Sequence, residues 1–185
     1  MSEVNSPLHE ALSAESLSSQ SPESAGSVAI TNPTEADVAN AYIPDAPVAE
    51  NYHPYFGALA KTLPIERLSQ VSTETRGWAA AMGFQSGLGT SIIEHIADIG
   101  PAYKSMSPEA QAQWTADQRS IALRHFGFDE KAVEALYAKA QQVLLDSKNE
   151  FGMVLASAPQ LRDFWLMQTL ANHADALAAK KAAKR

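Results

Sequence analysis

The spacing of apolar residues from Tyr55 onward most constrains the fold of this chain. Apolar side chains recur at intervals of three and four between glycines and prolines, and no sustained period-two run of β-branched residues occurs. Such intervals place side chains on one face of an α-helix, whereas a half-buried strand needs a period of two. We therefore predict an all-α fold: a small irregular helical body over residues 56–179, with a C-terminal helical hairpin.

The segment before this body has a different composition. Nine serines lie between Ser2 and Ser27, six of the ten prolines lie at or before Pro54, and large apolar residues are scarce. A segment of this kind cannot bury enough apolar surface to offset the chain entropy lost on ordering. We predict that residues 1–55 form a long disordered acidic arm, with at most a transient helix around residues 7–17.

Charge is segregated along the chain. The net charge of −7 divides into −8 for residues 1–60, −3 for residues 61–179 and +4 for residues 180–185. Opposite charges at the two ends favour contacts with partners over the enclosure of a substrate. Because basic residues are concentrated only in the last six positions, the sequence argues against nucleic acid as a partner.

Cysteine content and hydropathy argue against a disulfide-bonded, secreted or membrane-spanning protein. The chain has no cysteine, which excludes disulfides and thiolate metal sites. No apolar run reaches the roughly 18 residues of a membrane span, and the N-terminus lacks the basic start and apolar stretch of a secretory signal. We expect a soluble protein in a reducing interior, with no membrane partner.

Residues that favour helix ends predict the first two helices. One should begin near Pro64 and run or restart up to Gly83, which serves as its stop. The second should be capped by Thr90 or Ser91, carry a stripe of isoleucines toward the core, and end at Gly100–Pro101.

N-cap residues predict the start of the next two helices. Ser107–Pro108 predicts a helix that ends at Gly127, and Asp129 predicts the cap of the longest helix. Apolar residues in that last segment repeat at alternating steps of four and three, as in a heptad seam. Two alternatives stay open for the seam: packing within the chain, which is more common for a single seam of this length, and self-association. The candidate self-association residues are Val133, Tyr137, Ala140, Leu144, Phe151 and Val154.

The final helix is announced by Pro159. Leu161 to Met167 is the most hydrophobic cluster of the chain, and we expect it to pack antiparallel to the preceding long helix. Within this cluster, Phe164 and Trp165 are the best candidates for an aromatic anchor at an interface.

Signals for catalysis, metal or cofactor binding are weak. The five histidines include no pair at a spacing of three or four residues, which argues against zinc. Glu94, His95 and Asp98 form a weak acid–base or metal candidate, and a solvated helix face is the more common meaning of such a cluster. Gly87–Leu88–Gly89 lacks the third glycine and preceding strand of a nucleotide loop. We predict no catalytic, metal or cofactor site and no enzymatic activity.

The layout resembles the scaffolding, or capsid assembly, proteins of tailed bacteriophages. The similar features are the acidic Ser/Pro-rich arm, the helical centre, the stretch Arg124 to Leu136 that leads into a long helix, the start Pro159-Gln-Leu161, and the basic finish. The resemblance covers roughly residues 105–185.

What this resemblance implies is a protein that co-assembles with the major capsid protein, directs shell curvature, and leaves before DNA fills the head. The family's basic C-terminal contact falls here on Lys180, Lys181, Lys184 and Arg185, presented by the helix over residues 161–170. We therefore expect a non-catalytic homo-oligomeric assembly protein that binds the major capsid protein or another virion protein. It would act inside the procapsid, in the cytoplasm of an infected host cell, or remain in the virion.

Besides an undetected enzyme, which a buried polar pocket would bring back, two other classes remain open. The lysine-free, Ser-rich N-terminus is also similar to the leaders of secreted bacterial effectors or adaptors, which stay unfolded until export. A small nucleic-acid-binding regulator that uses the basic end is the other, and the acidic remainder of the chain argues against it.

Overall fold

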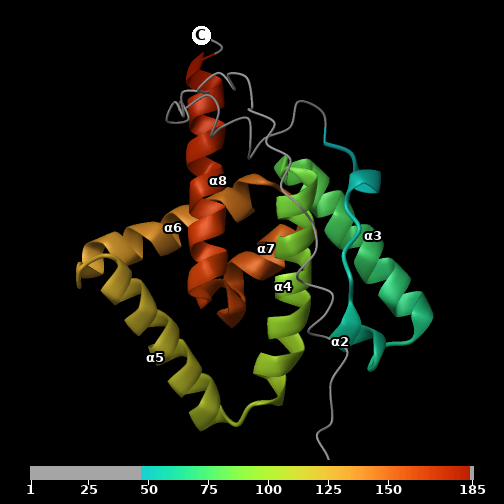
Figure 1. Ribbon diagram of the computed structural model, residues 1–185, viewed down its shortest axis with the longest axis horizontal. Helices are drawn as coiled ribbons and strands as arrows, with labels where there is room; N and C mark the ends of the chain where they lie inside the picture. The colour runs from blue at the N-terminus through green and yellow to red at the C-terminus, as the bar shows by residue number, and fades with distance from the viewer. Residues whose placement is uncertain (1–46, 184–185) are drawn as a thin grey trace, which may run out of the picture. The chain divides into compact units, whose positions relative to one another are not determined.

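The computed structural model describes residues 47–183, and all regular structure in this range is helical, which confirms the all-α prediction (Figure 1). The predicted arm lies mostly outside the described residues, as do Lys184 and Arg185. The elements are η1 (Ala49–Asn51), α2 (Gly57–Ala60), α3 (Ile65–Met82), α4 (Ser86–Ser105), α5 (Pro108–His125), α6 (Glu130–Asp146), α7 (Glu150–Ser157), η2 (Pro159–Arg162) and α8 (Phe164–Ala183), where η marks a 3₁₀-helix.

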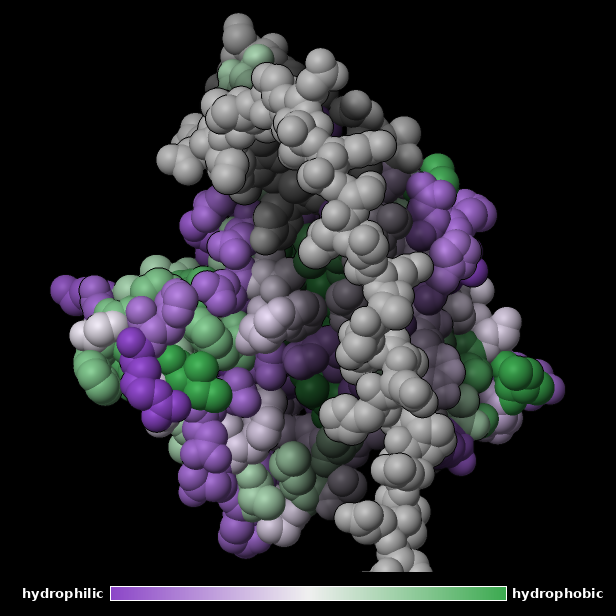
Figure 2. All heavy atoms as spheres, viewed as in Figure 1, coloured by the Kyte–Doolittle hydropathy of each residue, from purple (hydrophilic) through white to green (hydrophobic). Residues whose placement is uncertain are grey.

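The core draws large side chains from α3, α4, α6, α7, η2 and α8 and from the segments around Tyr52 and Phe84. Its largest fully buried members are Trp78, Tyr52, Phe84, Ile92, Ile93, Leu144, Leu161, Leu166, Leu170 and His173. Burying an aliphatic or aromatic side chain of this size contributes roughly 1.5–3 kcal/mol. In contrast, α5 buries only Ala122, and the surface over α5 in Figure 2 is mainly polar (purple), so this helix lies at the edge of the body.

The ordered body begins earlier than predicted. Residues 47–55, assigned to the arm from composition, pack against α3 and α4. Tyr52 is 0% exposed, and its hydroxyl lies 2.6 Å from Phe84 O and 3.2 Å from Ala79 O. A single aromatic residue with a polar tip, set in a polar context, can thus anchor a segment that composition marks as unfolded.

Three predicted helix ends are confirmed. Gly83 ends α3 in the left-handed region, with a φ of 73°. The Ser107 hydroxyl accepts a hydrogen bond from Ala110 N–H, and the Asp129 carboxylate accepts from Lys131 N–H. Each of these interactions satisfies backbone groups that the end of a helix leaves without partners.

The predicted limits of α4 were wrong at both ends. It begins at Ser86, so the expected caps Thr90 and Ser91 lie inside the helix, and it continues through Gly100–Pro101. A proline removes one backbone hydrogen bond, but its fixed φ suits a helix, and tertiary packing can outweigh the loss. Thr90 has a different role, since its hydroxyl accepts a hydrogen bond from His53 N–H at 3.3 Å.

The predicted long helix over residues 130–154 is two helices. The chain breaks after α6, where Lys148 adopts a positive φ of 53°, and Asn149 caps α7 by accepting from Phe151 N–H. The break allows Gly152 to lie against the Trp78 indole, where a β-carbon would come 3.1 Å from Trp78 Nε1. The heptad seam therefore does not continue along one helix.

The last helix packs against the preceding long helix as predicted, but the two are not antiparallel. Ala132 of α6 and Gln168 of α8 line the same surface hollow, and Lys139 Nζ donates to Asp175 Oδ1 at 2.8 Å. Both pairs are 36 residues apart, so α6 and α8 run in the same general direction. The segment formed by α7 and η2 returns the chain to the start of α8. The spacing of apolar residues instead predicts that the first part of this segment continues the helix of α6.

Candidate functional site

The basic C-terminal end, residues 180–185, begins inside α8 rather than after it. The last buried residue of α8 is Ala176, and the helix continues to Ala183. Lys180 and Lys181 occupy its last turn, where positive charge also interacts favourably with the helix dipole. Lys184 and Arg185 lie outside the described residues, so the structure places only half of the four predicted contact cations.

The two aromatic candidates have different surroundings. Phe164 is partly buried and connects α8 to α5, since its N–H donates to Gln118 Oε1 at 2.9 Å and its ring centroid lies 5.1 Å from that of His125. Trp165 is 40% exposed, with its ring centroid 4.5 Å from that of His95. Trp165 therefore offers an accessible aromatic surface, whereas Phe164 is a packing residue.

His95 pairs with a residue that sequence reasoning did not connect to it. Its Nε2 lies 2.9 Å from Asp163 Oδ1, and the same oxygen accepts from Leu166 N–H at the start of α8. Glu94 accepts from Tyr55 N–H at 2.7 Å, so Glu94 and His95, two members of the weak candidate group with Asp98, have separate partners. The His95–Asp163 pair joins α4 to the N-terminal cap of α8, so it stabilises the packing of these two helices.

The seam residues do not form a free self-association surface. Val133, Ala140 and Leu144 are buried in the single chain, and Tyr137 is partly covered, with the Arg162 guanidinium 4.5 Å from its ring centre. Val154, at 63% exposure, lies on the other side of the helix break. A coiled coil through all six residues would require the body to open, so the seam packs within the chain.

His173 is a fully buried histidine whose role the sequence did not indicate. Its Nε2 lies 2.7 Å from Met82 O, and because a carbonyl can only accept, Nε2 carries the proton. Nδ1 is buried without a partner among the described residues. Burial lowers the pKa of His173, against the opposing effect of its bond to Met82. His173 is therefore a neutral core residue.

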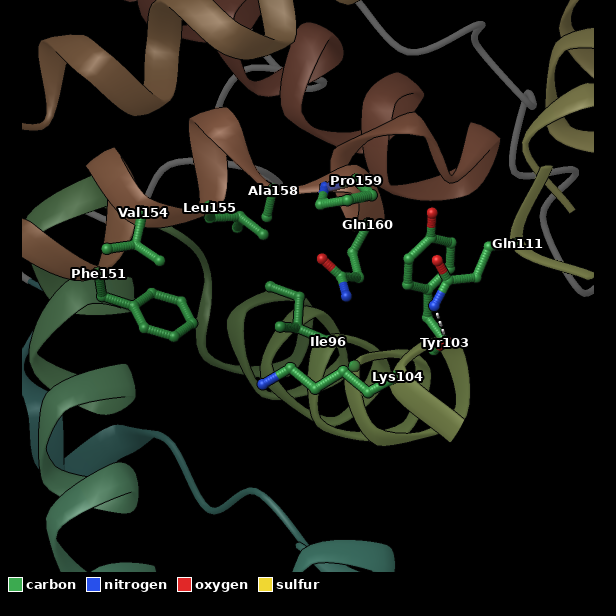
Figure 3. A pocket seen from close by; sticks show the side chains of 11 residues that line it. Ile96, Tyr103, Lys104, Gln111, Phe151, Val154, Leu155, Ala158, Pro159 and Gln160 are labelled. Atoms are coloured by element: carbon green, nitrogen blue, oxygen red, sulfur yellow. Dashed lines mark hydrogen bonds between the residues drawn. The ribbon is translucent and has the colours of Figure 1, made fainter. Parts of the chain in front are cut away.

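A groove between α4 and the α7–η2 segment was missed by the sequence analysis. We call it the α4–α7 groove; it has a volume of ≈ 480 Å³. Figure 3 shows its apolar wall, which includes Ile96, Phe151, Val154, Leu155, Ala158 and Pro159. Its residues come from two segments at least 40 positions apart, so no local motif could have indicated it.

Within residues 47–183, no group of three or more histidines and carboxylates is placed to hold a metal ion. In the same range, none of the helices combines the length and apolar character that a membrane span needs.

Comparison of the chain with protein-family models, with curated proteins and with solved structures found no match. Function must therefore be argued from the chain's own residues.

Proposed function

We propose that this chain is a non-catalytic assembly protein of the scaffolding type of tailed bacteriophages, and that its basic C-terminal end binds the major capsid protein or another virion protein. The observation that carries the proposal is the course of α8. One helix places Leu166, Leu170 and His173 in the core and continues without a break to Lys180 and Lys181. The partner would thus be held by a rigid extension of the body.

The charge pattern supports this proposal. The chain is acidic overall, and its last six residues carry +4. An exposed ion pair contributes only about 0–1 kcal/mol, so a single chain would bind weakly. Many chains bound to one shell would add their contacts through multivalency. Weak individual contacts suit a protein that acts in the procapsid and is then removed.

Self-association remains part of the proposal, but it must use another surface. Because the seam residues Val133, Ala140 and Leu144 are buried, copies cannot meet through them without unfolding. Sedimentation of the purified chain over a range of concentrations would reveal whether a homo-oligomer forms.

The test compares two sets of charge-neutralising substitutions. The first replaces the four cations of the basic end by glutamine: Lys180, Lys181, Lys184 and Arg185. The control replaces four cations elsewhere: Lys61, Arg67, Lys131 and Lys148. Both sets change the net charge by the same amount, so only the position of the charge differs. Each protein is mixed with a candidate major capsid protein, and assembled shells are separated by sedimentation.

The first set should abolish or strongly impair shell assembly, and the control set should not. Binding of the unmodified chain should weaken with added salt, because exposed charges are screened over about 10 Å at 0.1 M. Equal assembly by both sets would refute the role of the basic end.

A further inference from the structure

We propose that the α4–α7 groove binds a short peptide segment of a partner protein, one that places an aliphatic side chain in the groove with an acidic side chain beside it. This proposal does not rest on the function proposed above. The groove is built from α4, α7 and η2, whereas the basic end lies beyond the last buried residue of α8.

The first argument is the uncovered apolar wall. Val154 is 63% exposed, and Ile96 and Phe151 are only partly buried although they face the same hollow. The volume of ≈ 480 Å³ lies within the range of roughly 300–1,000 Å³ that is common for ligand sites. One or two aliphatic side chains would fill this space and remove the apolar wall from water.

The second argument is the Gln160 side chain. Gln160 is 8% exposed, and Figure 3 shows its amide directed into the groove between the two walls. Among the described residues, this side-chain amide has no hydrogen-bond partner. The amide atoms are not among the side-chain N and O atoms that are sealed from solvent without a partner, so they are accessible from the groove and can pair with an occupant.

The chemistry of the amide selects the kind of occupant. A primary amide offers N–H donors and a C=O acceptor, and a peptide backbone presents the complementary pair. A fatty acid presents acceptors alone, and a hydrocarbon presents neither. The Gln160 amide therefore favours a peptide over a lipid.

The third argument is charge. Among the described residues that line the groove, Lys104 is the only charged one, and it makes no ion pair within the described chain. Lys104 is exposed, so it can approach a carboxylate without a large desolvation cost. An acidic side chain next to the apolar anchor would complement it.

The test uses two fluorescein-labelled octapeptide libraries and the full-length chain. Both libraries carry a central leucine; in one, aspartate flanks it on both sides, and in the other, lysine does. Fluorescence anisotropy measures binding. We expect saturable binding of the aspartate library, about two- to fivefold tighter than that of the lysine library.

Three substitutions in the groove make separate predictions. Val154→Asp should abolish binding because it places a charge on the apolar wall. Lys104→Glu should reverse the preference between the two libraries. Gln160→Leu should weaken binding about three- to tenfold through the lost hydrogen bonds. Met153→Asp is the matched control, because Met153 is 48% exposed on the same helix but does not line the groove.

Circular dichroism checks that each variant is folded. Lys104 is exposed, so Lys104→Glu should fold even if Gln160→Leu does not, and the preference between the libraries can still be tested. Four results would overturn the proposal: no saturable binding of either library up to about 1 mM, equal affinity of the two libraries, the same loss for the Met153 control as for Val154→Asp, or binding of dodecanoate without binding of either library.

Discussion

Gly89→Ala should destabilise the body by forcing Tyr52 away from α4. Gly89 is buried inside α4, and a β-carbon there would lie 2.7 Å from Tyr52 Cδ1 and closer still to Cε1. The Tyr52 ring is fully buried and cannot move aside without losing its contacts with Ala79 and Phe84. The clash therefore acts directly on the segment that begins the described body.

The expected cost follows from three contributions. Overpacking of a filled site costs about 1–3 kcal/mol. Alternatively, displacement of the ring loses roughly 1.5–3 kcal/mol of burial, in addition to its hydroxyl contacts. The higher helix propensity of alanine opposes this by about 0.5–1 kcal/mol. We expect a net loss of up to about 4 kcal/mol in the free energy of unfolding.

Gly87→Ala is the matched control. Gly87 lies in the same helix, and a β-carbon there meets nothing within 4 Å. This variant should be more stable than the unmodified chain by about 0.5–1 kcal/mol. Urea denaturation followed by circular dichroism measures both variants. If Gly89→Ala proves as stable as Gly87→Ala, Tyr52 does not pack on α4.

A second readout concerns Tyr52 itself. Burial raises the pKa of Tyr52 to about 12. In a spectrophotometric titration, one of the five tyrosines should therefore resist ionisation until about pH 11, and in Gly89→Ala it should titrate near the ordinary value of about 10.

Three further predictions concern the core and the start of α8. Burial lowers the pKa of His173, so below about pH 6.5 the unfolded chain binds a proton at this residue that the folded chain does not. The free energy of unfolding should therefore fall by up to about 1.4 kcal/mol per pH unit as the pH decreases. In urea denaturation, His173→Gln should flatten this slope. Gly152→Ala, which puts a β-carbon 2.6 Å from Ser147 Oγ, 3.0 Å from Leu144 O and 3.1 Å from Trp78 Nε1, should lower the thermal midpoint at a cost of about 1–3 kcal/mol, and an unchanged midpoint would contradict the close approach of α7 to the end of α6. Asp163→Ala should lose about 1–2 kcal/mol with the cap of α8, whereas Asp163→Asn should keep most of it; equal losses in denaturation would show that the pair with His95 matters more than the cap.

The sequence predicted best those features that depend on neighbouring residues. The caps at Ser107 and Asp129 and the left-handed stop at Gly83 each involve groups within four positions of one another. Such interactions form wherever the helix forms, so residue type and spacing were sufficient to find them.

Features that depend on distant contacts were missed. Gly100–Pro101 has the residues of a helix stop, yet tertiary packing carries α4 through it. The helix break at Lys148 brings Gly152 close to Trp78, 74 positions earlier in the chain, and the Tyr52 hydroxyl contacts Ala79 and Phe84, which are far from it in sequence. For the same reason, the α4–α7 groove and the unpaired Gln160 amide could not be found from spacing.

The break between α6 and α7 has an optical consequence. Because α7 is a short helix separate from α6, it forms its own part of the wall of the α4–α7 groove, and the ring centroid of its Phe151 lies 5.1 Å from that of Trp78. Any displacement of this wall alters the environment of a sealed tryptophan. The emission of Trp78, read in a variant with Trp114 and Trp165 replaced by phenylalanine, would therefore report a displacement of α7 without an attached dye.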